Sequence, residues 1–297
     1  MRAAQTRDDV LITSGLVAAL IREQFPQWSE RVVVPVEPGG WDNRTFRLGD
    51  DLLVRLPSHA RYVPQVSKEH RWLPALAPLL PLPVPTPVAL GEPGNGYPWP
   101  WSVYRWLDGA APSLANVADT HAFARELAAF LRALQSIDAT SAPTPGEHNF
   151  FRGGLLSTYD GETREATAAL SDRIDASLAT AIWEAALSST WQQPSVWLHG
   201  DVAPSNLLVR DGRLAAVIDF GSCAAGDPAC DLTMAWTFFT GPARATFRDE
   251  MLLDAATWQR ARGWALWKAL IVACGKTGTA EAARDAWRVL GELLAEP

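Results

Sequence analysis

Two short stretches of the chain hold the residues best suited to chemistry. The stretch 197–209 contains Asp201 and, five positions later, Asn206, and the stretch 215–221 contains Asp219. Two carboxylates and one carboxamide offer oxygen ligands without thiols or imidazoles. Such a set suits Mg²⁺, a hard cation that usually keeps waters and substrate phosphates in its coordination shell.

The segment between these stretches predicts a β-hairpin that would bring the three residues together. Leu207–Arg210 and 213–218 are short and apolar, and Asp211-Gly212 between them is typical of a two-residue hairpin turn. A hairpin of this size returns the chain, so we expect Asp219 to end near the other two residues. The alternative is a solvated hairpin whose Asp and Asn are only turn residues, which explains Asp211-Gly212 but not the rest.

The spacing of these residues resembles the catalytic and metal-binding loops of the protein-kinase-like phosphotransferases. Protein kinases carry H-R-D-x-x-x-x-N followed by D-F-G. This chain carries His199-Gly200-Asp201 with Asn206, followed by Asp219-Phe220-Gly221. His-Gly-Asp is the form seen in the aminoglycoside phosphotransferase family, which also commonly carries G-D-P-x-x-D, here 226–231.

The resemblance implies an α+β, protein-kinase-like fold with two lobes. We expect a small antiparallel sheet in an N-terminal nucleotide-binding lobe, residues 1–104, and a short hinge at 105–109. Residues 110–297 would form a larger, mostly helical lobe for catalysis and substrate binding. The Gly-bearing loop 37–43 would be the flap over the nucleotide phosphates, although a plain hairpin turn fits it equally well on local grounds.

The resemblance also assigns roles to the polar residues. Asp201 would orient the acceptor hydroxyl and take its proton, and Asn206 and Asp219 would hold Mg²⁺. Arg55 occupies the strand position where kinases have a phosphate-binding lysine, and Glu69 on the next helix would be its partner. Arginine at this position departs from the kinase pattern. Guanidinium can bind phosphate, but it is not interchangeable with ammonium. The alternatives are an exposed strand arginine and a glutamate on a solvated helix face.

Four further residues would contact the nucleotide base. The backbones of Arg105 and Leu107 would bond the adenine edge, and Leu208 and Ile218 would form the apolar floor under the purine. An internal edge strand is the alternative for the hinge segment.

Several other motif residues have supporting roles by the same resemblance. His199 would fix the loop by hydrogen bonding, and Gly200 replaces an arginine of protein kinases, which predicts constitutive activity. Asp227 and Asp231 would brace the catalytic segment, although a turn before Pro228 and a helix N-cap explain them equally well.

Composition narrows the class of protein and its partners. The 297 residues are 48% hydrophobic and 20% charged, which is ordinary for a globular protein. A net charge of −7 does not favour nucleic acid or an anionic membrane as partner. Residues 1–9 lack an apolar signal core, and the three cysteines form no metal spacing. We expect reduced thiols in a cytoplasmic protein; the sequence does not give its oligomeric state.

Hydrophobic periodicity predicts the remaining elements. Strands are expected at 32–36, 45–48, 52–56, 88–90 and 101–107. Helices are expected at 11–25, 66–76, 120–137, 231–239, 243–253, 257–274 and 280–294, with two or more within 155–191.

Three functions are compatible with the sequence. The favoured one is a kinase that uses ATP or GTP with Mg²⁺ and phosphorylates a hydroxyl of a small molecule, either an aminoglycoside or macrolide or a metabolite such as a sugar or amino alcohol. The second is a protein kinase, against which the absent A-P-E segment counts. The third is a non-catalytic nucleotide-binding module, suggested by Arg55 in place of lysine.

Overall fold

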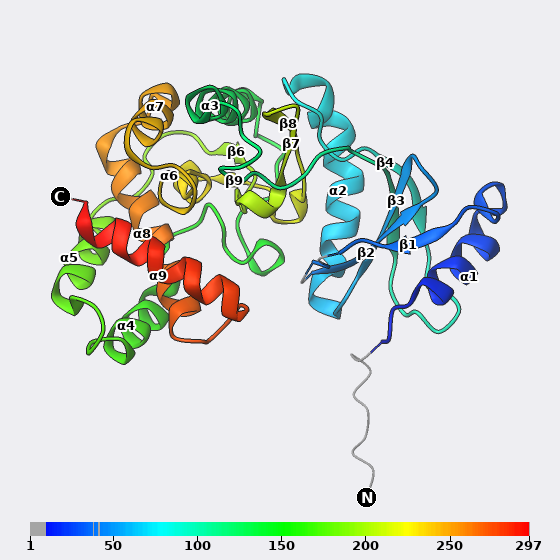
Figure 1. Ribbon diagram of the computed structural model, residues 1–297, viewed down its shortest axis with the longest axis horizontal. Coiled ribbons are helices and arrows are strands. Elements are labelled where there is room, and N and C mark those ends of the chain that lie inside the picture. The colour runs from blue at the N-terminus through cyan, green and yellow to red at the C-terminus, as the bar shows by residue number, and fades with distance from the viewer. Residues whose placement is uncertain (1–9, 38, 41, 297) are drawn as a thin grey trace, which may run out of the picture. The chain divides into compact units, whose positions relative to one another are not determined.

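The computed structural model describes residues 10–37, 39–40 and 42–296 (Figure 1). By its internal contacts the chain forms two units. One comprises the residues up to Asp108 together with Ala216–Gly221, and the other comprises 109–215 and the residues from Ser222 onward. The segment Ala216–Gly221, which contains Asp219, thus belongs by its contacts to the N-terminal unit, although the sequence placed it in the C-terminal lobe.

The N-terminal unit is built on one antiparallel sheet with spatial order β1-β2-β3-β5-β4. Its strands are β1 (Val33–Pro35), β2 (Asn43–Leu48), β3 (Leu52–Pro57), β4 (Pro87–Gly91) and β5 (Trp101–Arg105). The register pairs Arg55 of β3 with Thr45 of β2 and with Ser102 of β5. Arg55 is on the central strand and its side chain is 11% exposed, so it is not the exposed strand arginine considered above.

The two faces of this sheet follow from the alternation along β3. Leu52, Val54 and Leu56 are fully buried and pack with α1 (Ser14–Gln24) in one apolar core. Arg55 lies on the other face, where its partner Glu69 comes from α2 (Val63–Leu76). Because successive strand residues point to opposite faces, one strand supplies both the core and the site.

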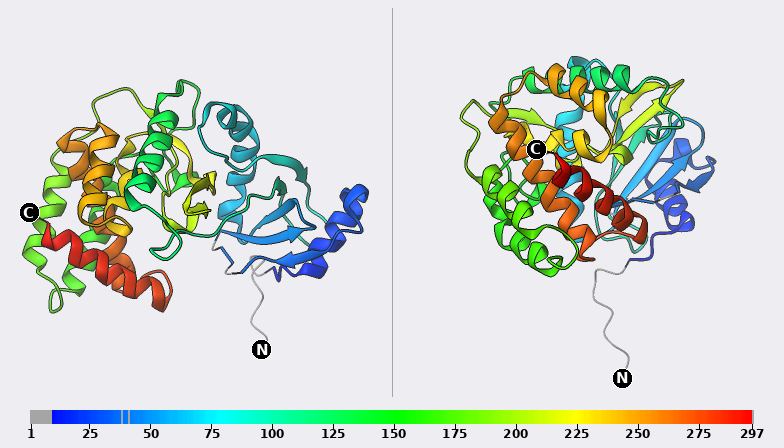
Figure 2. Two further views of the ribbon diagram at one scale, coloured as in Figure 1. Left: turned by 45° about the horizontal axis from the view of Figure 1, so that its top comes forward. Right: turned by 60° about the vertical axis from the view of Figure 1, so that its left-hand side comes forward.

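The C-terminal unit is mostly helical, and Figure 2 shows its helices from two further directions. They are α3 (Thr120–Ser136), α4 (Asp160–Ala169), α5 (Ala176–Leu187), α6 (Met234–Thr237), α7 (Gly241–Met251), α8 (Ala255–Ala273) and α9 (Ala280–Ala295). Helix α8 is central: it packs on α4, α5 and α9, and it is buried on nearly all sides. Trp264 and Trp267 on α8 belong to this core.

Two small two-stranded sheets carry the motifs of the sequence. The strands β7 (Leu207–Arg210) and β8 (Arg213–Val217) form the predicted hairpin. Asp211 and Gly212 have φ of 54° and 80°, as a turn with both central residues left-handed requires. The second sheet pairs β6 (Val196–Leu198) with β9 (Ala224–Gly226) and was not predicted.

Most predicted elements are found within a few residues of their expected bounds, but the helix expected at 231–239 is wrong. A 3-10 helix, Pro228–Leu232, is followed by the single-turn helix α6. Asp231 is turned into the interior instead of capping a helix, and Phe239 packs its ring 6.1 Å from that of Phe123 on α3. These tertiary contacts override the local helical pattern.

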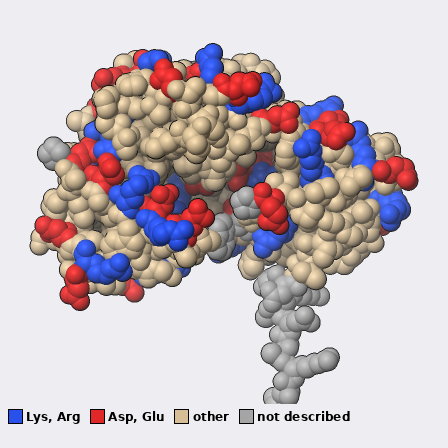
Figure 3. Space-filling model, viewed as in Figure 1, with Lys and Arg blue, Asp and Glu red and all other residues tan. Residues whose placement is uncertain are grey.

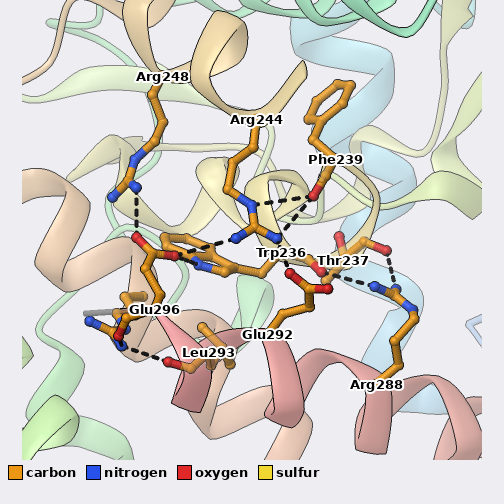
Figure 4. A network of polar contacts seen from close by, with 10 residues as sticks. Trp236, Thr237, Phe239, Arg244, Arg248, Arg288, Glu292, Leu293 and Glu296 are labelled. Carbon is orange, nitrogen blue, oxygen red and sulfur yellow. Dashed lines mark hydrogen bonds and ion pairs between the residues drawn. The ribbon is translucent and has the colours of Figure 1, made fainter. Parts of the chain in front are cut away.

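The end of α9 is fastened to α6, α7 and α8 by a polar network (Figure 4). The carboxylate of Glu296 accepts hydrogen bonds from the indole N–H of Trp236 and from Arg248. Its backbone carbonyl accepts from Arg262. Although burial alone would raise the pKa of Glu296, the hydrogen bonds from Trp236 and Arg248 bring it below its ordinary value.

The surface has no single dominant charge on the face that Figure 3 shows, where basic and acidic side chains are interspersed. Within residues 10–37, 39–40 and 42–296, the helices are too short or too polar to cross a membrane.

The Glu296 network predicts a pH-dependent contribution to stability. Because the folded-state pKa is lowered, the contribution is present above the ordinary pKa of 4.5 and is lost as pH falls through the folded-state value. We expect Glu296→Gln to lower the free energy of unfolding near neutral pH by about 1–3 kcal/mol. The difference from wild type should shrink with acidification, measured by denaturant unfolding at several pH values. Asp285→Asn, on the exposed face of α9, is the control, and a pH-independent difference for Glu296→Gln would contradict this account.

Candidate active site

The catalytic loop of the sequence begins directly after β6 and is held by one buried carboxylate. The backbone N–H groups of His199 and Gly200 donate to the two oxygens of Asp231, each at 2.7 Å. Asp231 is fully buried. Gly200 has φ of 86°, and a Cβ there would lie 2.4 Å from the carbonyl oxygen of Ser222, so only glycine fits.

Asp231 therefore braces the loop and does not act as a helix N-cap. Burial raises the pKa of its carboxyl, while His199 and the two backbone N–H groups work in the opposite direction. Asp227 caps the 3-10 helix that contains Asp231, by accepting from the N–H of Ala229, and pairs with Arg260 of α8 at 2.6 Å. The G-D-P-x-x-D motif thus connects the central helix to the catalytic loop.

Asp201 and Asn206 contact each other in this loop. The Asn206 side-chain amide donates to the backbone oxygen of Asp201 at 2.9 Å and to its carboxylate at 3.1 Å. Asp201 is exposed and Asn206 is buried. His199 accepts a hydrogen bond from the backbone N–H of Asp201 through Nδ1, so it fixes the loop. With both amide hydrogens of Asn206 directed at Asp201, its Oδ1 is the atom suited to a cation.

A second cluster lies in the N-terminal unit and centres on Arg55. Its Nη1 contacts the two oxygens of Glu69 at 3.2 and 3.3 Å, and its Nη2 donates to Asp219 at 2.7 Å. The hydroxyl of Tyr104 also donates to Glu69. Burial alone would lower the pKa of Arg55, but Asp219 and Glu69 raise it, so the guanidinium stays charged. Arg55 and Glu69 are brought together as expected, whereas the contact with Asp219 was missed.

Asp219 contacts Arg55 from a backbone conformation that few residue types adopt. Asp219 has φ of 65°, a left-handed conformation that is rare for residues other than glycine, asparagine and aspartate. Its distance from Arg55 is 164 positions along the chain, which no local pattern could reveal. A planar guanidinium can bind two carboxylates at once, which a lysine ammonium does with less geometric definition.

The hinge residues differ in what their backbone offers. The N–H of Arg105, the last residue of β5, donates to the carbonyl of Thr86 at 3.0 Å. Among the described residues, the backbone of Leu107 makes no hydrogen bond to protein. A base at this segment would therefore meet the polar backbone atoms of Leu107 rather than the N–H of Arg105.

The residues predicted to form the apolar floor under the purine lie on or next to the β7–β8 hairpin. Leu208 lies on β7 and Ile218 follows β8, and both are half-buried. In the predicted flap, Pro38 and Trp41 lie outside the described residues, as do residues 1–9. Gly40 accepts a hydrogen bond from Arg44 of β2.

The predicted magnesium ligands are divided between the units. Asp201 and Asn206 belong to the C-terminal unit, and Asp219 belongs to the N-terminal unit with Arg55. Their meeting around one ion stays a prediction. The donors suit Mg²⁺, because Asn206 offers a carbonyl oxygen and Asp219 a carboxylate. No group of three His, Cys, Asp or Glu in the described chain is arranged for a metal ion.

Fold and loop geometry together define a kinase-like phosphotransferase. The model of the phosphotransferase enzyme family matches residues 33–264, and the chain belongs to this family. The predicted family, the α+β fold and the enzyme class, a phosphotransferase with an alcohol group as acceptor, are thereby confirmed. No curated protein matches the chain.

Solved structures with the same fold cover nearly the whole chain. The protein named APH(2")-IIia, solved with GDP and kanamycin, is 18% identical, with a TM-score of 0.71 over 93% of this chain and 97% of its own. The macrolide 2'-phosphotransferase MphH from Brachybacterium faecium is 21% identical, with a TM-score of 0.60 over 94% and 98%. Another macrolide 2'-phosphotransferase, of type I, is 17% identical, with a TM-score of 0.63 over 97% and 100%. At these identities the likeness shows the fold.

The two hydrogen bonds from the catalytic loop to Asp231 predict a large effect of removing its carboxylate. We expect Asp231→Ala to lower the free energy of unfolding by about 2–4 kcal/mol, because two buried N–H groups lose their acceptor. Asp231→Asn should be milder, because its amide oxygen still accepts one bond. Asp254→Ala, which removes the N-cap of α8, is the control and should cost about 1 kcal/mol. Equal effects of Asp231→Ala and Asp254→Ala in denaturant unfolding would show that the hydrogen bonds to Asp231 stabilise the fold no more than an ordinary helix N-cap does.

Proposed function

We propose that this protein is a cytoplasmic kinase that transfers the γ-phosphoryl group of ATP or GTP to a hydroxyl of a small molecule. The observation that carries the proposal is the contact of Asn206 with Asp201 in a loop bound by the buried Asp231. The three unpaired cysteines fit a reducing compartment.

Phosphoryl transfer places a particular demand on these residues. Its transition state is loose, so positioning and neutralisation of charge supply most of the catalysis. The exposed carboxylate of Asp201 would accept a hydrogen bond from the acceptor hydroxyl and take its proton as the new P–O bond forms. The bond from the γ-phosphorus to the β–γ bridging oxygen breaks in the same step, and ADP or GDP leaves. The amide of Asn206, donating to Asp201, would fix the direction of that carboxylate.

The Arg55 cluster would serve the nucleotide. Arg55 would contact the α- and β-phosphates, and Glu69, itself bound by Tyr104, would hold the guanidinium in place. Asn206 and Asp219 would hold Mg²⁺, which when bound neutralises charge on the phosphate oxygens. Two of the arginine's contacts in the structure are carboxylates, so its charge is partly balanced before phosphate binds.

The ligands of similar proteins support the choice of nucleotide and acceptor. Solved structures of this fold include complexes with GDP and kanamycin, and with ATP and streptomycin. Others are named as macrolide 2'-phosphotransferases. Aminoglycosides and macrolides are therefore the first acceptors to test, with sugars and amino alcohols as the metabolite alternative.

The non-catalytic alternative is the less favoured one. A module that only binds nucleotide has no physical need for a hydrogen-bonded Asp201–Asn206 pair. Tight Mg²⁺-independent nucleotide binding without turnover of any acceptor would favour it.

Loss of the Asp201 carboxylate should separate binding from chemistry. We expect Asp201→Ala to retain thermal stabilisation by Mg-nucleotide and to lower kcat by about two to four orders of magnitude, because the acceptor hydroxyl loses its base. The readout is phosphate transfer to the best acceptor found in a screen with ATP and GTP. Asp285→Ala is a control far from the loop in sequence and should behave as wild type. Full activity of Asp201→Ala would show that its assigned role is wrong.

Loss of Asp219 should act on nucleotide binding instead. We expect Asp219→Ala to abolish the Mg²⁺-dependent part of the thermal shift produced by nucleotide. A weaker Mg²⁺-independent shift should remain, because Arg55 is then released to bind phosphate. Glu69→Gln is the matched variant, since it weakens the same arginine cluster without touching a proposed metal ligand. An unchanged Mg²⁺ dependence in Asp219→Ala would exclude it as a ligand.

A further inference from the structure

The side chain of Arg152 in the C-terminal unit packs against aromatic rings and makes no hydrogen bond or ion pair with the described residues. The guanidinium carbon of Arg152 lies 4.7 Å from the ring centroid of Trp267 and 5.2 Å from that of Trp264. The two indoles are nearly perpendicular, at 82°. A guanidinium in such a corner is attracted to both π-faces, which fixes its plane.

The aromatic corner is itself rigid. Tyr159 lies 4.0 Å from Trp267 between ring centroids, and its hydroxyl donates to the carbonyl of Phe150. The indole N–H of Trp267 donates to Glu162 of α4 at 2.7 Å. Trp264 and Trp267 are anchored in the buried helix α8. The guanidinium of Arg152 therefore packs against aromatic side chains that are themselves held by burial and hydrogen bonds.

The loop that contains Arg152, residues 146–155, contacts β6 and the segment on either side of β9. The buried Asn149 donates to the carbonyls of Arg152 at 2.9 Å and Ser222 at 3.4 Å. The N–H of Asp227 donates to the carbonyl of Gly153 at 2.9 Å. A Cβ on Gly153 would lie 2.2 Å from a side-chain carbon of Leu198, the residue before His199. Arg152 and the catalytic loop thus share one support.

The guanidinium of Arg152 has no hydrogen-bond acceptor and no ion-pair partner among the described residues. The neighbouring acids are engaged elsewhere. Glu162 accepts from Trp267, Asp227 pairs with Arg260, and Asp231 binds the catalytic loop. Arg152 is half-buried, so its N–H donors are fixed in direction yet remain accessible to a ligand.

We propose that Arg152, held by Trp264 and Trp267, is a binding residue for an anionic oxygen group, carboxylate or phosphate, on the acceptor. The inference rests on the proposed kinase function and narrows its substrate class. A fixed planar guanidinium binds such groups through paired, charge-assisted hydrogen bonds. It repels a polycation. The acceptor is then a hydroxyl compound that bears negative charge, which favours the metabolite alternative over aminoglycosides.

The first test measures anion binding without turnover. The full-length protein with Mg-ADP is treated with the arginine reagent phenylglyoxal, and modification is located by peptide mass spectrometry. The probes are glycerate and glycerol phosphate, with glyceramide and glycerol as their neutral matches. We expect an anion to protect Arg152 while its neutral match does not, and the stronger of the two anions identifies carboxylate or phosphate as the group. Arg173, exposed and stacked on Trp287, is the internal control and should be modified equally throughout.

The second test measures acceptor choice. Phosphate transfer from ATP and GTP is screened over hydroxyl compounds in matched anionic and neutral pairs, with kanamycin as the polycation. Arg152→Ala should raise KM for the best anionic acceptor by about ten- to a hundredfold. Arg152→Lys, which keeps the charge but loses the fork, should fall between it and wild type, and Arg173→Ala should match wild type.

Two results would overturn the inference. One is equal modification of Arg152 with and without both anions. The other is a wild-type preference for kanamycin or for neutral acceptors that Arg152→Ala does not change. The proposed kinase function can fail independently of this inference. In that case an anion protects Arg152 of the wild-type protein, but Mg-nucleotide gives no thermal stabilisation or no acceptor is phosphorylated.

Discussion

The buried carboxylate of Asp231 is the constraint on which the catalytic loop depends. A carboxylate taken out of water is costly unless its oxygens accept hydrogen bonds, and here two consecutive backbone N–H groups supply them. After these two N–H groups the chain passes close to the carbonyl of Ser222, which only Gly200, with positive φ and no Cβ, allows. The loop conformation and the buried acid thus stabilise each other, and Asp201 emerges from the loop on the exposed side.

The same arrangement connects the central helix α8 to the catalytic loop. Arg260 is buried in α8 and pairs with Asp227, which caps the 3-10 helix containing Asp231. A buried ion pair of this kind contributes little to stability by itself, since desolvation opposes attraction. Its value lies in geometry, because it fixes where the 3-10 helix begins and therefore where the Asp231 carboxylate stands.

In the N-terminal unit, an arginine occupies the strand position where kinases have a lysine, and its planar guanidinium has a different geometry. Arg55 contacts Glu69 and Asp219 at once. The helix glutamate, the strand arginine and the aspartate of the D-F-G segment are therefore linked in one cluster. The substitution that first suggested a non-catalytic module is accommodated by an ordered charge cluster.

Sequence reasoning reached the features that local patterns encode. The β7–β8 hairpin followed from its turn dipeptide, and the Arg55–Glu69 pair followed from family spacing. The partner strands β6 and β9 were missed because each has only three residues and no alternation to detect. The Arg55–Asp219 contact depends on long-range folding and was missed. The role of Asp231 in bracing the catalytic segment was expected from the family resemblance, whereas the local helical pattern of 231–239 pointed to a cap. The aromatic contacts of Arg152 were also hidden, since cation–π stacking leaves no periodic signal.

The central claim is that oxygens of Asn206 and Asp219 bind one Mg²⁺ together with the nucleotide phosphates, beside Asp201. A crystal structure of the protein with Mg²⁺ and a non-hydrolysable ATP or GTP analogue tests it most directly. The account predicts one ion ligated by both side chains and by phosphate oxygens. An ion bound without either residue, or Asp219 paired with Arg55 and not ligating the ion in the loaded protein, would contradict it.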